Sequence, residues 1–301
     1  MLKGKTAAYA GLIFVIFIWG LSPLITVYLH NFFSPTIRIA FGTFFCALSM
    51  LAISGKNIKL LNKDYLKIAL PTGLCMGLAD ILQKIGLLHT TPAHYAFLEN
   101  LSVVVVPILL FFMVKKKPAA LTIIAAVLCL VSCFILTGMI SGGAQIFWLG
   151  DILCALAGIF YGINIAVTGV HAKRFFVPLY LAIQLFVESV LSFITAFALD
   201  ITKIEPIMFT FKAKPILMNI VFVLISLTLG WLIRTWAMKS VDPTVVAVMM
   251  PFSATVTVIA SIILGQDTIS TELITGAVLG LAAIILSGLG DKEPKPKKQT
   301  E

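Results

Sequence analysis

The chain has 301 residues, of which 60% are hydrophobic and 12% are charged, and its mean hydropathy is +1.07. This composition excludes an ordinary soluble enzyme and indicates a protein that lies in a lipid bilayer. The net charge of +9 does not indicate nucleic-acid binding, because the basic residues lie in short connections between apolar runs, where they set membrane topology.

Apolar runs separated by charges, glycine and proline predict ten membrane-spanning helices, and therefore an all-α integral membrane protein. The spans are expected at 7–29, 35–54, 66–88, 93–114, 119–140, 148–170, 178–199, 216–238, 244–264 and 270–289. The short connections at 89–92 and 239–243 must be real turns, because a helix through either would be about twice as long as the bilayer is thick. Pro92 and Pro243 supply these breaks.

Lysine and arginine are distributed unequally between the predicted connections. With the N-terminus inside, sixteen basic residues lie on the cytoplasmic side and three outside, while Arg38, Lys84 and Arg234 lie within spans. This bias predicts a multi-pass protein of the inner or plasma membrane with both termini cytoplasmic. The tail at 291–301 is rich in proline and lysine, so we expect it to be disordered and to anchor the topology or contact lipid headgroups.

The two halves of the chain resemble each other. A shift of 151 residues aligns the segment 91–102 with 242–253, and pairs Pro92 with Pro243. A shift of about 142 aligns Trp19 with Tyr161. Each half contains five spans, and an odd number forces the second copy to enter the membrane from the opposite side. We therefore expect two inverted repeats, at 1–140 and 147–290, followed by the cytoplasmic tail.

Several segments carry a family resemblance. They are "FIWGLSPLI" in the first span, Arg38 in the second, the junction "GLLHTTPAHYAFLENLSVVVVPI", its counterpart "AMKSVDPTVVAVMMPF", and "GDILCALAGIFYGINIAV". Together they are similar to EamA-type members of the drug/metabolite transporter superfamily, over roughly residues 7–289. The resemblance implies a ten-helix metabolite carrier that works by alternating access, with a central cavity formed mainly by spans 1, 3, 4, 6, 8 and 9. Members of the family are associated with amino acids, nucleotide-linked metabolites, amines and drugs.

The third span is unusually polar for that family. Asp80 and Lys84 are four residues apart, so they share one helical face in the favourable orientation for an ion pair. The pair either neutralises itself and holds helices together, or lines the cavity and exchanges partners with a charged substrate. Gln83 extends the polar surface and favours the second interpretation. This polarity argues against a purely hydrophobic or aromatic substrate.

Glu99 is a second acidic candidate within a span, beside Asn100 and four residues after Tyr95. Burial away from water favours the protonated form of a carboxyl group, which would suit a coupling proton. The alternative is a permanent salt bridge to Lys84 or Arg38. Glu188 also lies within a span and is ambiguous: because span 7 is peripheral in the resembling family, packing or helix contact is favoured over a functional role.

Aromatic and basic residues complete the predicted site. Trp19, Tyr161 and Trp231, like Tyr95, can stack on a planar substrate or attract an ammonium group, and Asn164 adds a neutral donor and acceptor. Arg234 is either an interface anchor or a cavity residue, since the shift of 151 places it on Gln83. The predicted substrate-binding residues are thus Trp19, Asp80, Gln83, Lys84, Tyr95, Glu99, Asn100, Tyr161, Asn164, Trp231 and Arg234, with Glu99 as the proton-coupling candidate.

The sequence contains no Walker A loop, HExxH motif or dense Cys/His ligand set. It therefore predicts no enzyme, cofactor or metal. We expect a secondary transporter, monomeric or homodimeric, that contacts membrane lipid and moves a small polar or zwitterionic metabolite, such as an amino acid or a derivative, by export or exchange. The alternatives are a proton-coupled exporter of organic cations or drugs, with Glu99 and Tyr95 as its binding pair, and a non-transporting membrane scaffold.

Overall fold

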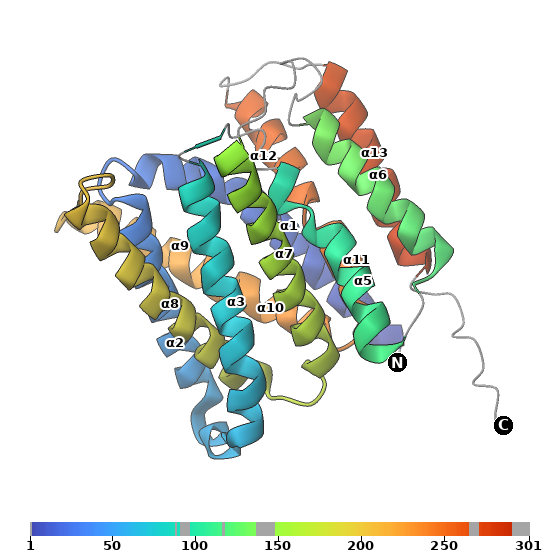
Figure 1. The fold of residues 1–301 in the computed structure, drawn as a ribbon, viewed down its shortest axis with the longest axis horizontal. Coiled ribbons are helices and arrows are strands. Elements are labelled where there is room, and N and C mark those ends of the chain that lie inside the picture. Colours follow the sequence, from blue (N-terminus) through green and yellow to red (C-terminus); the bar gives the residue numbers. More distant parts are fainter. Residues whose placement is uncertain are drawn as a thin grey trace.

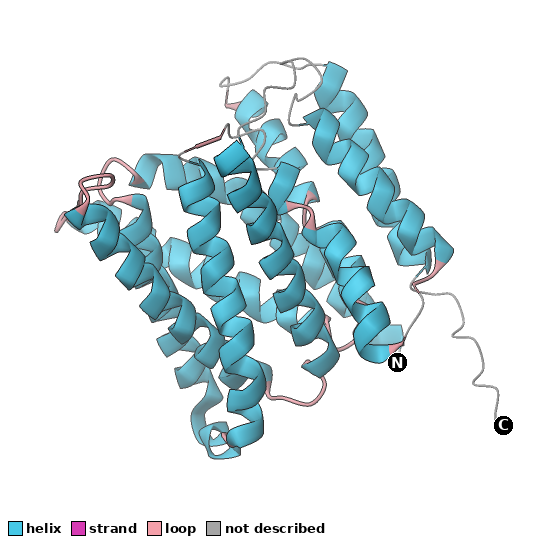
Figure 2. Ribbon diagram, viewed as in Figure 1, coloured by secondary structure: helices cyan, strands magenta, loops and turns pink. Residues whose placement is uncertain are grey.

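A computed structural model describes residues 2–87, 89–90, 97–115, 118–136, 148–264 and 271–290. These residues form a helical bundle whose helices are joined by short connections (Figures 1 and 2). The first half contains α1 (Leu2–Leu29), α2 (Pro35–Ser54), the 3-10 helix η1 (Gly55–Leu60), α3 (Lys63–Leu87), α5 (Ser102–Val114) and α6 (Ala120–Leu136). A short helical turn at 97–99 precedes α5.

The second half contains α7 (Trp148–His171), α8 (Val177–Ile201), α9 (Ala213–Phe222), the π-helix η2 (Val223–Leu229), α10 (Gly230–Ala237), α11 (Pro243–Met249), α12 (Phe252–Ile263) and α13 (Thr271–Gly290). Seven helical segments in the described part of the chain are long and apolar enough to cross a membrane, and three shorter apolar helices, at 120–135, 243–257 and 274–290, complete ten. The expected ten-helix fold is confirmed.

The structure corrects three of the predicted helix starts. Helix α9 begins at Ala213 rather than at residue 216. Helix α1 begins at Leu2 rather than at residue 7, and α3 begins at Lys63 rather than at residue 66. For α3 the reason is a cap: the Asn62 side-chain oxygen accepts hydrogen bonds from the backbone N–H groups of Asp64 and Tyr65, at 3.0 and 3.1 Å. A capped helix starts where its first backbone N–H groups are hydrogen-bonded. In α3 this position lies before the start of the apolar run.

Counterpart helices of the two halves pack against each other. Helix α2 packs on α8, and α6 packs on α13 in the pair that lies at one side of the bundle in Figure 1. Along α6 and α13, the Ser132 hydroxyl donates to the Gly276 carbonyl at 2.7 Å, while Thr122 lies beside Gly290. The two helices therefore run in opposite directions, as two inverted halves require.

The close approach of α1 and α12 depends on a glycine. A methyl group at Gly20 would lie 2.5 Å from Cβ of Val256 and 2.7 Å from the backbone oxygen of Ser253. Both distances are shorter than van der Waals contact, so only glycine lets the two helices pack at this separation.

The same close approach recurs between α7 and α5. A methyl group at Gly162 would lie 2.6 Å from Cγ1 of Val105 and 3.4 Å from Cα of Ser102. The shift of 151 pairs Ser102 with Ser253 and Val105 with Val256, which are the two residues that Gly20 contacts. The internal repeat is therefore visible in individual contacts between helices. The packing of α1 on α12 corresponds to the packing of α7 on α5.

The bundle has an apolar outside and a partly polar inside. On α1, Phe14 and Phe17 are about half exposed, at 48% and 54%, whereas Arg38 and Arg234 are among the buried residues. This is the reverse of a soluble protein, and it suits a chain whose surface meets lipid. The polar interior is where the candidate site lies.

Candidate functional site

The site begins with the polar face of α3. The Lys84 ammonium group donates a hydrogen bond to the Asp80 carboxylate, as the i, i+4 spacing predicts. Both side chains are largely buried, and Gln83 beside them is buried as well. The predicted ion pair therefore exists, and it lies inside the bundle rather than on its surface.

Three helical segments meet at Gln83. The Tyr161 hydroxyl of α7 donates to the Gln83 side-chain oxygen at 3.3 Å, and the Glu99 side chain, from the turn before α5, interacts with Gln83 and lies near Asp80. Asn100, the residue after Glu99, is partly buried. Glu99 thus faces the polar surface of α3.

Arg234 of α10 lies in an aromatic environment. Its guanidinium carbon is 4.8 Å from the Trp231 ring centroid and 5.9 Å from that of Trp19, and the two rings are 5.3 Å apart at 62°. Arg234 is 5% exposed, and among the residues that the structure describes its Nε atom has no hydrogen-bond partner. Tyr161 is close enough to interact with it electrostatically. Arg234 is therefore buried against α1, and its role as a cavity residue stays a prediction.

The two aromatic–polar contacts are related by the duplication. The shifts of 142 and 151 pair Trp19 with Tyr161 and Gln83 with Arg234. In the structure Tyr161 contacts Gln83, and Trp19 contacts Arg234. The equivalent contact is thus formed twice between the halves, with a neutral amide in one case and a guanidinium in the other. Because the contacts join α1 to α10 and α7 to α3, the site lies where the two halves meet.

We name these residues the central cluster: Trp19, Asp80, Gln83, Lys84, Glu99, Tyr161, Trp231 and Arg234. Asp80, Gln83 and Arg234 are buried, at 8%, 6% and 5% exposed, and the other members of the cluster are partly buried. Its formal charges balance, with two carboxylates and two cations. Such a buried, balanced set can exchange its internal ion pairs for contacts with a charged ligand without leaving net charge in the membrane.

Asn164 occupies a different network. Its side-chain N–H group donates to the Thr72 carbonyl at 3.0 Å, and the Thr72 hydroxyl is 2.9 Å from the Tyr180 hydroxyl. Thr168 and Gln184 are also bonded to Tyr180. These buried bonds join α3, α7 and α8, and place the amide of Asn164 at a helix junction. The residue type alone could not reveal this, because the acceptor is a backbone oxygen.

Two other residues that the sequence singled out are not part of the cluster. Tyr95 lies outside the described residues. Arg38 donates to the Thr26 hydroxyl at 3.3 Å and lies 5.1 Å above the Phe222 ring centroid. Of the two salt-bridge partners considered for Glu99, Lys84 is bonded to Asp80 and Arg38 is packed between α1 and α9.

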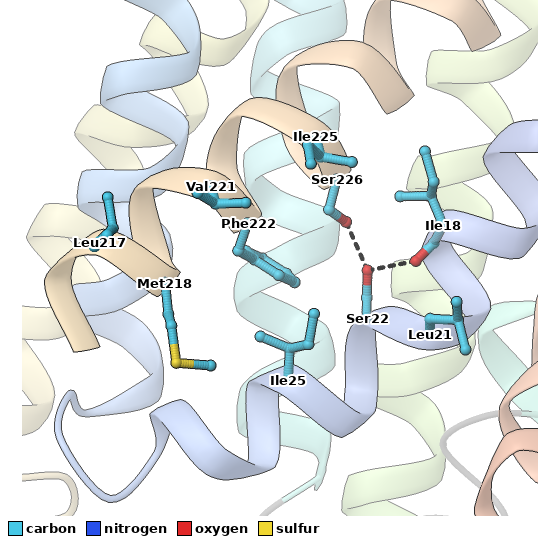
Figure 3. Close-up of a pocket in the computed structure, with 10 residues that line it drawn as sticks. All are labelled: Ile18, Leu21, Ser22, Ile25, Leu217, Met218, Val221, Phe222, Ile225 and Ser226. Carbon is cyan, nitrogen blue, oxygen red and sulfur yellow. Dashed lines mark hydrogen bonds between the residues drawn. The ribbon is translucent and has the colours of Figure 1, made fainter. Parts of the chain in front are cut away.

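A groove of about 400 Å³ separates α1 from α9 and η2. Ser22 and Ser226 are hydrogen-bonded at 2.6 Å on its wall (Figure 3), and the Trp19 indole donates to the Ser226 carbonyl at 2.9 Å. The groove is lined by Ile18, Leu21, Ser22, Ile25, Leu217, Met218, Val221, Phe222, Ile225 and Ser226. Sequence reasoning missed η2, since a π-helix of seven residues is too short for its i→i+5 periodicity to be recognised in the sequence.

The fold and cluster define a multi-pass membrane protein of two inverted five-helix halves. The EamA-like transporter family matches both halves, at residues 6–138 and 148–289, and the chain therefore belongs to that family, which contains membrane transporters and not enzymes. A solved structure described as "Crystal structure of protein" has a TM-score of 0.77 with 15% sequence identity, over 95% of this chain and 98% of that chain. That likeness supports the fold alone. No curated protein sequence matches the chain.

Proposed function

We propose that the protein is a secondary transporter that moves a small polar or zwitterionic metabolite, an amino acid or a derivative, by export or exchange. The observation that carries the proposal is Arg234: a buried guanidinium, stacked on Trp231 and Trp19, without a carboxylate partner among the described residues. A buried cation needs an anion, and a substrate carboxylate would supply it through paired hydrogen bonds.

The side of the cluster away from Arg234 is suited to bind the ammonium group of a zwitterion. Asp80 and Glu99 both lie near Gln83 on the α3 side, and Tyr161 lies between them and Arg234. An ammonium group would bind the carboxylates and the ring of Tyr161. In this proposal the halves, 1–140 and 147–290, rock about the cluster, so that it opens to each compartment in turn.

Ligand-induced thermal stabilisation tests this assignment. A panel of amino acids and amines should contain a compound that stabilises the detergent-purified protein, by about 2.7 kcal/mol at a hundred times its Kd. Arg234→Met should weaken binding of that compound by about 10- to 150-fold, since a charged hydrogen bond contributes about 1.5–3 kcal/mol. The matched control is Arg174→Met, which removes a half-exposed surface arginine paired with Asp64. Equal affinity in both variants would contradict the role of Arg234.

The second candidate is proton-coupled export of organic cations or drugs, and the contact of Glu99 with Gln83 favours it. Here Glu99 binds either a proton or the cation, among the aromatic rings of Trp19, Tyr161 and Trp231. Transport in liposomes separates the two candidates. Loss of cation transport with retained zwitterion transport in Glu99→Gln supports the cation exporter, and the reverse pattern supports the zwitterion carrier.

The charge distribution also predicts orientation. We propose that both termini and the tail 291–301 are cytoplasmic in an inner or plasma membrane, and that the transporter is a monomer or a homodimer. A reporter that is active only outside the cell should be inactive when fused after residue 301, and active when inserted into the connection between α8 and α9. Activity of the terminal fusion would contradict this orientation.

A further inference from the structure

Glu188 of α8 is a buried acid that the central cluster does not include. It is 6% exposed, and its Oε2 atom has no hydrogen-bond partner among the residues that the structure describes. The sequence favoured packing or helix contact for this residue, but packing alone needs no carboxyl group. Burial of an ionised carboxylate without a donor is costly, so this side chain must carry a proton or face a cation.

Helix α3 presents such a cation to Glu188. Gly73, Gly77, Asp80 and Lys84 are spaced so that they share one face of α3, and both glycines lie against α8. A methyl group at Gly77 would lie 3.2 Å from Cα of Glu188. The charges of Asp80 and Lys84 act on Glu188. Two carboxylates therefore compete for one ammonium group, which in this conformation is bonded to Asp80.

The charged groups that act on Glu188 are Asp80 and Lys84 of α3. Ser192, one turn later on α8, is 1% exposed, and its hydroxyl also has no partner among those residues. From α2 the titratable group that faces Glu188 is the Cys46 thiol, which is bonded to the Thr228 hydroxyl at 3.4 Å. Glu188 and Ser192, on neighbouring turns of α8, thus each have a buried oxygen atom without a hydrogen-bond partner among the described residues.

We propose that Glu188 binds the proton that is exchanged during transport, and that Lys84 moves between Asp80 and Glu188 as this proton leaves and returns. With Glu188 protonated, Lys84 pairs with Asp80, as in this structure. When the O–H bond of Glu188 breaks, the proton passes to the water of one compartment, and the carboxylate attracts Lys84. Asp80 is then released toward the central cluster. This last step rests on the proposed function, whereas proton binding at Glu188 does not.

Infrared difference spectroscopy against pH tests proton binding without a substrate. The protein in lipid vesicles should show a protonated carboxyl band that disappears as the pH is raised. Glu188→Gln should remove a component of this band that Glu99→Gln retains. A band that is unchanged in Glu188→Gln, or its absence from the wild-type protein, would overturn the proposal. Either result would leave the assignment of Arg234 standing, and failure of every ligand in the thermal screen would leave proton binding standing.

A second variant keeps Glu188 and gives a directional result. Asp80→Asn removes a negative charge and frees Lys84 to pair with Glu188. The midpoint of the Glu188 band should then move to lower pH by about 1–3 units. A midpoint that stays in place or moves upward would show that Lys84 does not serve both carboxylates, and would overturn the exchange of partners.

Discussion

Gly20→Ala is expected to destabilise the protein by about 1–3 kcal/mol, the usual range for an overpacked contact. The added methyl group meets the branched Cβ of Val256 and the Ser253 carbonyl at 2.5 and 2.7 Å. Neither atom can move aside without movement of α12, so α1 and α12 must separate. Thermal unfolding of the purified protein measures the loss.

The same helix offers a matched control. Gly4 also lies in α1, and a methyl group there has no atom within 4 Å. Gly4→Ala should therefore leave stability unchanged or raise it by up to about 1 kcal/mol, because alanine favours a helix. Gly162→Ala, at the equivalent contact between α7 and α5, should resemble Gly20→Ala. Equal stabilities of the Gly4 and Gly20 variants would show that the close approach does not determine the packing of these helices.

Lys84→Met is expected to lower the free energy of unfolding by about 3–5 kcal/mol, because it leaves the buried Asp80 carboxylate without its partner. The double variant Asp80→Asn/Lys84→Met removes both charges and should recover most of that loss. Thermal unfolding of the two variants beside the wild-type protein measures the difference. A double variant as unstable as the single one would show that the ion pair itself stabilises the fold.

The double variant also separates the two interpretations of the pair. If Asp80 and Lys84 only hold helices together, the folded double variant should bind the ligand found in the thermal screen as the wild-type protein does. If they contact the substrate, binding should fall by at least about tenfold, since each charged hydrogen bond contributes about 1.5–3 kcal/mol. Ligand titration of the folded double variant decides between them.

The sequence predicted the ten helices and their inverted arrangement because both depend on features that act along the chain. An apolar run must be about as long as the bilayer is thick, and five spans per half fix the opposite orientation. The contact of Asp80 with Lys84 was predictable for the same reason, since four residues make one helical turn. The helix starts were less predictable, as the cap at Asn62 shows.

Contacts between helices were harder to predict. The burial of Arg234 under Trp19 depends on the packing of α1 against α10, which no local pattern records. The backbone bond of Asn164 to Thr72 and the π-helical turn at Ser226 depend in the same way on a neighbouring helix. The surroundings of Glu188 were equally unpredictable, because its burial and the charges of α3 that act on it depend on the packing of α8 against α3.

The inverted duplication has a consequence for sidedness. If the halves were identical, exchanging their conformations would convert the inward-facing form into the outward-facing form at no cost in free energy, and neither form would be preferred. Any resting preference must therefore come from positions at which the halves differ. In the interior these positions include Gln83, which corresponds to Arg234, and Asp80, which corresponds to Trp231. In the proposed function these same residues bind the charged ligand, so the differences that give binding would also set the preferred conformation of the empty protein.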